Sequence, residues 1–227
     1  MKKALFFVVA VLGFQFSYSQ DEPVENNAKE PLFNFFLGAG ATFLGDYNIN
    51  QNLANAGMPS INEVMPELSL GYTISSQKLA LDFEVNANFM DKSANNYRLR
   101  AVGSGIKLRG HYIPYKTDAF FVSGGLDVSY VMTYFDLNDR NSVIDLNDLD
   151  PTTQTGHINL NNALLYAGPS VAVGLFQNKA FPMRINVGYD FALTNGRWKS
   201  DFANVVNRVG ESGHSRFYAK IYIPVFN

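Results

Sequence analysis

Hydrophobic and polar residues alternate with a period of two along much of this chain. The clearest stretch is residues 79–89, where one set of alternate positions is apolar and the other is polar or charged. The apolar set is Leu79, Leu81, Phe83, Val85, Ala87 and Phe89, and the polar set is Asp82, Glu84, Asn86 and Asn88. Successive side chains of a β-strand point to opposite faces, so this spacing predicts a strand with one apolar and one polar face.

The same alternation recurs along the chain and predicts an all-β protein of about eight strands. The expected strands cover residues 33–43, 66–75, 79–89, 97–112, 119–135, 163–176, 183–194 and 216–226. In the fourth strand the parity of the apolar positions changes near Gly103, which predicts a β-bulge and would turn Arg98 and Arg100 inward. The sixth strand is the weakest prediction, because it contains Gly168-Pro169 and proline cannot donate to a strand ladder.

Longer and shorter segments alternate between the expected strands. The longer segments are 45–65, 91–96, 136–162 and 195–215, and the shorter ones are 75–78, 114–118 and 177–182. Up-and-down transmembrane barrels have this rhythm, with short periplasmic turns and longer outer loops. We therefore expect an up-and-down antiparallel barrel with its long loops outside and both termini in the periplasm.

The N-terminus has the features of a secretory signal peptide. Two lysines precede an apolar run from Ala4 to Phe14, which is too short to span a bilayer, and small residues follow at Ser17 and Ser19. The expected organisation is a signal peptide at 1–19, a flexible periplasmic lead at 20–32 and an outer-membrane β-barrel at 33–227.

Composition narrows the possible partners. Removing residues 1–19 removes Lys2 and Lys3, so 16 basic residues remain against 20 acidic ones and the formal charge is −4. That balance argues against a nucleic-acid partner. The chain has no cysteine, which excludes disulfides and a thiol-linked lipid anchor.

Alternation alone does not separate a membrane barrel from a soluble, lipocalin-like barrel with its faces exchanged. Two placements favour the membrane barrel. Glycines lie on the polar face, where they would make room inside a narrow barrel, at Gly38, Gly40, Gly71, Gly125 and Gly188. Aromatic residues lie near strand ends on the apolar face, as membrane-interface girdles do, at Phe33, Phe43, Phe89, Tyr112, Tyr130, Tyr134 and Phe217.

With these features the chain resembles the small, about eight-stranded bacterial outer-membrane β-barrel proteins. The resemblance covers residues 33–226 and includes the Gly188-Tyr189-Asp190-Phe191 strand, the Trp198-Lys199-Ser200-Asp201 loop and the aromatic last strand. It implies an outer-membrane location, contact with outer-membrane lipid and lipopolysaccharide, and insertion by the barrel-insertion machinery. In that family a near-terminal aromatic residue is the insertion signal; Phe226 matches it, although Asn227 follows.

An eight-stranded barrel has an interior only wide enough for its own side chains. We expect a charge network there, in which acids pair with bases because buried charges need partners. Its expected members are Asp82, Glu84, Lys107, Arg109, Asp127, Arg184, Asp190 and Lys220, and Glu67 is a further inward acid that could pair with these bases. The alternative is a narrow path for small polar solutes, although mixed charges argue against strong ion selectivity.

Two weaker patterns could carry chemistry. His214 and Ser215, or His157 facing Ser215, could provide the base and nucleophile of a lipid deacylase or acyltransferase, with Glu211 or Asp201 as the orienting acid. Acidic residues in the loop after residue 136 could bind a hard cation, but the spacing of a known calcium loop is missing. The candidate metal ligands are Asp145, Asp148 and Asp150.

The functional hypothesis is a non-enzymatic envelope protein without a cofactor. It would act as a scaffold, as a surface-interaction module with a protein partner at its long loops, or as an accessory subunit of an outer-membrane secretion or transport complex. The alternatives are a small polar channel, a lipid-modifying enzyme and a soluble binder. Trp198, with Lys199, is expected to anchor a loop base or the membrane interface.

Overall fold

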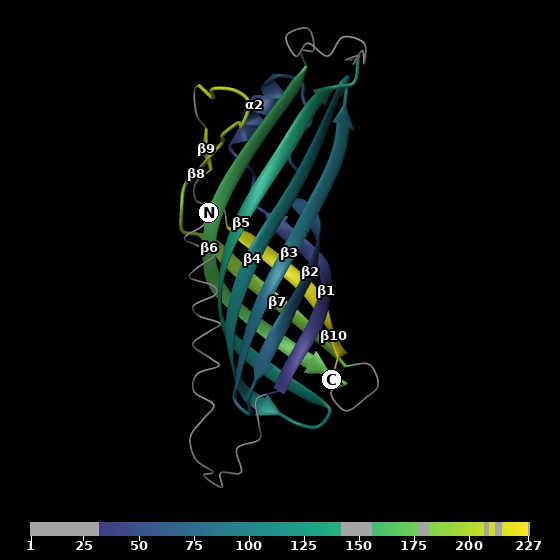
Figure 1. Cartoon of the computed structure of the whole chain (residues 1–227), viewed down its shortest axis with the longest axis vertical. Helices are drawn as coiled ribbons and strands as arrows, with labels where there is room; N and C mark the ends of the chain where they lie inside the picture. The colour runs from purple at the N-terminus through teal and green to yellow at the C-terminus, as the bar shows by residue number, and fades with distance from the viewer. Residues whose placement is uncertain (1–31, 142–155, 177–181, 207–208, 212–214, 227) are drawn as a thin grey trace. The chain divides into compact units, whose positions relative to one another are not determined.

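The computed structural model describes residues 32–141, 156–176, 182–206, 209–211 and 215–226 of the 227-residue chain. Eight long strands form a barrel (Figure 1). They are β1 (Leu32–Leu44), β2 (Val64–Ser75), β3 (Leu79–Ala94), β4 (Tyr97–Lys116), β5 (Phe120–Asp139), β6 (His157–Leu175), β7 (Met183–Ala192) and β10 (Arg216–Phe226). The link between β1 and β2 carries helix α2 (Ile49–Asn55), and the link between β7 and β10 carries the short pair β8 (Gly196–Arg197) and β9 (Gly210–Glu211).

The strands close in the order β1-β10-β7-β6-β5-β4-β3-β2, and each neighbouring pair is antiparallel. The first and last strands pair directly, from Phe35 opposite Phe226 to Leu44 opposite Arg216. Closure leaves the barrel sheet without a free edge. A β structure inside a bilayer requires this, because unpaired backbone groups would face hydrocarbon. The prediction of an all-β up-and-down barrel of about eight strands is confirmed. Within the described residues, no helix is long and apolar enough to span a membrane.

The two faces of the wall differ as in a transmembrane barrel. Along β3 the apolar side chains from Leu79 to Phe89 point outward and are exposed, while Asp82 and Glu84 point inward and are buried. About ten residues at about 3.3 Å each, tilted by about 40°, climb about 25 Å, which is the height of the apolar band of such barrels. The apolar face therefore looks out and the charged face looks in, so the lipocalin-like alternative does not describe this chain.

The wall is taller on one side than on the other. Strands β3 to β6 have 16, 20, 20 and 19 residues, whereas β1, β2, β7 and β10 have 13, 12, 10 and 11. The extra length lies at the end that carries α2 and the β8–β9 pair (Figure 1). We call this the long-link end, and the opposite end, with the β2–β3 and β4–β5 turns, the short-turn end.

The predicted bulge near Gly103 is wrong. Strand β4 stays in register with β3 and β5 through that residue, and the irregularity lies between Tyr112 and Tyr115. Leu99 and Ala101 point inward and are buried, so Arg98 and Arg100 point outward. The parity never changes; the lining of the barrel instead becomes apolar at this height, which the alternation alone could not reveal.

The sixth strand is longer than expected and begins at His157. Pro169 pairs with Leu126 of β5, whereas the ladder with β7 passes from Ala167 to Ser170 without it. Proline has no backbone N–H to donate to a strand ladder, and Pro169 accordingly lies where the ladder with β7 is interrupted.

Two glycines of the inner face let aromatic rings lie against the wall. A Cβ built at Gly188 would lie 2.5 Å from the phenol oxygen of Tyr218, and one built at Gly71 would collide with the ring of Phe36. Both aromatic residues are buried inside the barrel. The glycines of the polar face therefore make space for inward rings.

Several predictions lie outside the described residues. These are the signal peptide at 1–19, the lead up to residue 31, His214, and the candidate metal ligands Asp145, Asp148 and Asp150. Among the described residues, no group of three or more His, Asp or Glu side chains could hold a metal ion.

Candidate functional site

The barrel interior holds as many bases as acids in its charged layer. All lie on inward positions of the strands, and all are buried except Arg184, whose side chain is 12% exposed. The acids are Glu67, Asp82, Glu84, Asp127 and Asp190, and the bases are Lys107, Arg109, Arg184, Arg216 and Lys220. We call these residues the interior network. It contains all eight charged residues expected from the sequence and Glu67, which strand parity also placed inward; only Arg216 was not expected there.

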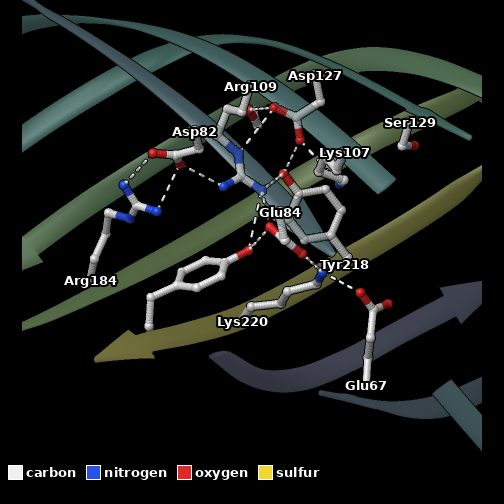
Figure 2. Close-up of polar contacts among 12 residues, drawn as sticks. Glu67, Asp82, Glu84, Lys107, Arg109, Asp127, Ser129, Arg184, Tyr218 and Lys220 are labelled. Carbon is white, nitrogen blue, oxygen red and sulfur yellow. Dashed lines mark hydrogen bonds and ion pairs between the residues drawn. The ribbon is translucent and has the colours of Figure 1, made fainter. Parts of the chain in front are cut away.

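Arg109 lies at the centre of the interior network (Figure 2). Its guanidinium nitrogens lie 2.9 Å from an oxygen of Asp82, 3.3 Å from Glu84 and 3.1 Å from Asp127. It also donates to the phenol oxygens of Tyr218 at 3.3 Å and Tyr222 at 3.2 Å. A planar guanidinium has five N–H donors, so a single arginine can join these carboxylates and the two tyrosines.

One branch of the network runs from β4 and β5 to β7 and β10, toward the long-link end. Lys107 bridges Asp127 at 3.1 Å and Asp190 at 3.3 Å. Arg216 then pairs with Asp190 at 2.9 Å and donates to Ser129 at 2.7 Å. Each of these acids therefore has a cation on two sides.

The other branch reaches β1 and β2. Lys220 pairs with Glu84 at 2.5 Å and also with Glu67 (Figure 2). The Glu67 carboxylate also accepts a hydrogen bond from Thr42. At the short-turn end, Arg184 pairs with Asp82 at 2.7 Å. Every strand of the barrel contributes a charged side chain or a hydroxyl to the network, with Thr42 of β1 and Ser170 of β6 supplying hydroxyls, so the network connects all eight strands.

The charges need one another because they are out of water. Removing one partner of a buried ion pair costs about 3–5 kcal/mol, since the other charge stays buried and unpaired. The aromatic rings fill the space between the charges: Lys107 Nζ lies 3.4 Å from the ring centroid of Tyr218, and Arg216 lies 4.3 Å from that of Tyr166. Charge balance and ring packing together make this layer a buried polar core.

A second cluster, above the interior network, is apolar. Residues from the links pack against the inner face of the tall wall. We call this set the mouth cluster: Tyr47, Ile49, Leu53, Ile61, Met65, Met90, Leu99, Ala101, Phe135, Leu137 and Trp198. The Trp198 ring meets Phe135 edge-on at 4.9 Å between centroids, and Tyr47 at 6.1 Å. This cluster is the reason that the lining of β4 becomes apolar at Leu99 and Ala101.

Glu211 of β9 fastens the mouth cluster. Its carboxylate is fully buried and accepts hydrogen bonds from Trp198 Nε1 at 2.7 Å, the Asn48 amide at 2.8 Å and the Ile49 amide at 3.1 Å. The two amides belong to the N-terminus of α2, where N–H groups lack helical partners. One carboxylate thus joins α2, the β8–β9 pair and the tryptophan.

The sequence offered only part of this arrangement. Glu211 was one of two candidate orienting acids, with Asp201, for a hydrolytic histidine, but it is buried against Trp198 and α2 instead. Trp198 is itself buried in the mouth cluster, so of its two expected roles it anchors the base of a link and does not lie at the membrane interface. Helix α2 lies in a segment without a strong periodic signal, and its seven residues are stabilised by packing more than by propensity.

The candidate hydrolytic residues are not brought together among the described residues. His157 is exposed and pairs with Asp136 at 3.2 Å. The backbone oxygen of Ser215 accepts from Gly45 at 3.2 Å, and Asp201 accepts from Asn161 at 3.2 Å. The backbone of Phe226 pairs with Phe35 at the short-turn end, and its role as insertion signal stays a prediction.

A serine–histidine chain does occur, but inside the barrel. His111 Nδ1 lies 2.9 Å from Ser123 Oγ and Nε2 lies 2.7 Å from Ser170 Oγ, and Ser170 donates to Asp127 at 2.6 Å. All four residues are buried. A nucleophile needs room for a substrate, so this chain serves as an internal hydrogen-bond link to the interior network.

The long-link end also has an open pocket, which we call the α2 pocket. Its volume is about 780 Å³, and it lies between α2, the start of β2 and Lys92 of β3. Asn50 fixes its floor: its side chain donates to Asp46 at 2.7 Å and exchanges hydrogen bonds with the backbone of Ile61 at 2.8 and 3.1 Å. The rim carries Asp46 and Glu63 together with Lys92. Carboxylates, amides and an amine on one fixed rim can bind a polar ligand through several hydrogen bonds.

No family model and no curated protein sequence matches the chain. Solved structures do match in fold. A major outer membrane protein from Thermus thermophilus is 11% identical, with 85% of this chain and 98% of that chain covered and a TM-score of 0.50. The attachment invasion locus protein Ail of Yersinia pestis is 6% identical (86% and 99% covered, TM-score 0.47), and the outer membrane protein OprG from Pseudomonas aeruginosa is 12% identical (87% and 98% covered, TM-score 0.46). The chain therefore has the fold of the small outer-membrane β-barrel proteins.

Proposed function

We propose that this chain is a non-conducting outer-membrane protein that acts through its long-link end, as a surface-interaction module or as an accessory subunit of a larger assembly. One observation supports the proposal: two layers of buried side chains lie inside the barrel, the interior network and the mouth cluster above it. A solute would have to break several buried ion pairs and displace Trp198 to pass. The barrel then serves as a membrane anchor for the structure at its long-link end.

The orientation follows the usual rule for such barrels, in which short turns face the periplasm and long links face outward. The α2 pocket and the β8–β9 pair would then lie at the cell surface, among the head groups and sugars of lipopolysaccharide. Outer-membrane lipid would surround the apolar band, and the barrel-insertion machinery would place the chain there. Both termini would lie in the periplasm.

The α2 pocket is the best candidate for the contact with a partner. Its floor is rigid because both polar atoms of the Asn50 side chain are engaged. A preformed site loses little conformational entropy on binding. Its rim carries two acids and one lysine, so we expect a partner with basic or polyhydroxyl groups.

Conductance tests the first half of the proposal. The folded mature chain, inserted in planar bilayers, should give no steady current. Glu211→Ala and Trp198→Ala, combined in one variant, should loosen the mouth cluster while leaving the interior network, so the barrel should still conduct no steady current. A steady open current from the wild-type chain would contradict the proposal and support the channel alternative.

Affinity purification from gently solubilised membranes tests the second half. A partner that binds at the α2 pocket should be recovered with the wild-type chain and lost with Glu63→Lys plus Gln51→Ala, which alter two residues that line the pocket. The matched control is Lys116→Glu at the short-turn end, which changes the charge of another exposed residue. Recovery unchanged by the pocket variant, or no partner at all, would count against an interaction role there.

A further inference from the structure

A groove crosses the outer wall at the short-turn end. Its volume is about 700 Å³, and it runs over β3, β4 and β5. Two registers define it: Leu81 lies opposite Gly110, which lies opposite Leu126, and in the next row Tyr112 lies opposite Gly124. We call this the wall groove.

The wall groove exists because two outward positions have no side chain. A Cβ built at Gly110 would have no atom within 4 Å, and one at Gly124 would meet its nearest atoms at 3.8 Å. Nothing on the protein therefore requires glycine at either position. The flanking leucines are left uncovered, with Leu126 67% exposed and Leu79 61% exposed. The recess is therefore lined by apolar side chains, and no side chain of the protein occupies it.

A basic residue belongs to the turn beside the wall groove. The turn between β2 and β3 is tightly held, since Ser76 and Leu79 exchange backbone and side-chain hydrogen bonds of 2.8 to 3.4 Å. Lys78 lies in this turn, and its backbone oxygen accepts from the Ile113 amide of β4 at 2.8 Å. Ser76 and Leu79, on either side of Lys78 in the sequence, both line the groove. The lysine is exposed, and its backbone is fixed beside the recess.

We propose that the wall groove binds one phospholipid, with an acyl chain in the recess between Gly110 and Gly124 and the phosphate at Lys78. The outer face of the wall is bathed in lipid, so an acyl chain is the molecule present there at high concentration. Hydrocarbon is as apolar as the leucines, so the gain comes from van der Waals contact in the recess and not from leaving water. A lysine near a membrane surface adds attraction for an anionic head group.

A second copy of the chain is the competing occupant. The recess is only two glycines wide, and Leu126, Leu79 and Tyr112 rise around it. A flat barrel wall from another copy would rest on these side chains and leave the recess empty, whereas a single flexible chain can enter it. The wall groove lies at the opposite end from the α2 pocket, so this inference stands apart from the proposed function.

Native mass spectrometry of the folded mature chain in mild detergent tests the proposal. The probe is phosphatidylglycerol, with phosphatidylcholine as a zwitterionic comparison. Gly110→Leu with Gly124→Leu adds bulk to the recess, and a Cβ at either site meets no atom closer than 3.8 Å. Ala87→Leu adds bulk to an outward position elsewhere on β3 and is the matched control. Lys78→Gln removes only the charge, and its exposed position leaves folding intact.

The wild-type chain should retain one phosphatidylglycerol per barrel, and the double leucine variant should bind it at least about fivefold more weakly, while the control keeps wild-type binding. Lys78→Gln should weaken phosphatidylglycerol about fivefold and phosphatidylcholine much less. Circular dichroism verifies the β content of each variant. Equal binding by the wild-type and double leucine chains would overturn the proposal, and so would a dimer that only the double leucine variant loses. A Lys78→Gln chain with an unchanged head-group preference would overturn the assignment of the phosphate.

Discussion

The indole nitrogen of Trp198 donates a hydrogen bond of 2.7 Å to the carboxylate of Glu211. The same carboxylate accepts hydrogen bonds from the two backbone amides at the start of α2. This buried carboxylate thereby connects Ile49 and Glu211, which are 162 residues apart in the sequence. The mouth cluster depends on this contact, because without it α2 has no partner for its first amides. Since Trp198 is the only tryptophan in the chain, the contact can be followed by fluorescence.

Glu211→Ala should therefore shift the emission of Trp198 to longer wavelength, as water reaches the indole. Leaving the buried indole and two amides without an acceptor should also cost about 2–4 kcal/mol of unfolding free energy. Emission spectra and urea unfolding in lipid vesicles provide the two measurements. Glu63→Ala, an exposed acid near α2, is the control; an unchanged spectrum for Glu211→Ala would mean that the link is not formed in the membrane.

Arg109→Met should be among the most damaging single changes in the barrel. It leaves Asp82, Glu84 and Asp127 with fewer cations in a buried layer, and we expect a loss of about 3–5 kcal/mol. Arg100→Met removes a charge of the same type from the exposed outer side and should have little effect. Chemical unfolding in vesicles compares the two, and equal stabilities would show that the interior network does not hold the barrel.

Gly188→Leu should block folding, because its Cβ would lie 2.5 Å from Tyr218. Shortening the partner ring should make room, so Gly188→Leu with Tyr218→Ala should fold better than Gly188→Leu alone. The yield of folded barrel after refolding into vesicles measures both. A double variant as defective as the single one would show that the ring is not what requires glycine there.

Ile106→Arg tests which face meets the lipid. Ile106 is exposed on the outer side of β4, midway along the apolar band, and an arginine at the bilayer centre costs about 2–4 kcal/mol in such barrels. The same substitution at Val64, near the long-link end of β2, should cost less because it lies nearer the interface. If both variants unfold at the same urea concentration as the wild type, the apolar face does not contact lipid.

The wall of this barrel could be predicted from the sequence better than its contents. Alternation in residues 79–89 and 216–226 was enough to assign the strands and their faces, because each position on a strand has only two directions in which to point. The mouth cluster could not be predicted in this way. Leu99 and Ala101 were assigned outward because they are apolar, but links that lack any period fold back and cover them from inside.

The interior network shows the same limit on a smaller scale. Strand parity placed Lys107 and Arg109 inside, yet their partners come from strands distant in sequence, such as Asp190 on β7 and Tyr218 on β10. Arg216 was visible as a polar position of the last strand, but its contacts with Asp190 and Ser129 depend on the stagger of the closed barrel. A single sequence does not specify that stagger.

The unequal height of the wall gives the molecule a front and a back in the plane of the membrane. Strands β3 to β6 extend further at the long-link end than β7, β10, β1 and β2, so they form a wall on one side of α2. A large partner approaching the long-link end would meet the tall wall on one side and reach α2 from the other. Rotation of the barrel about its own axis would then decide which encounters succeed.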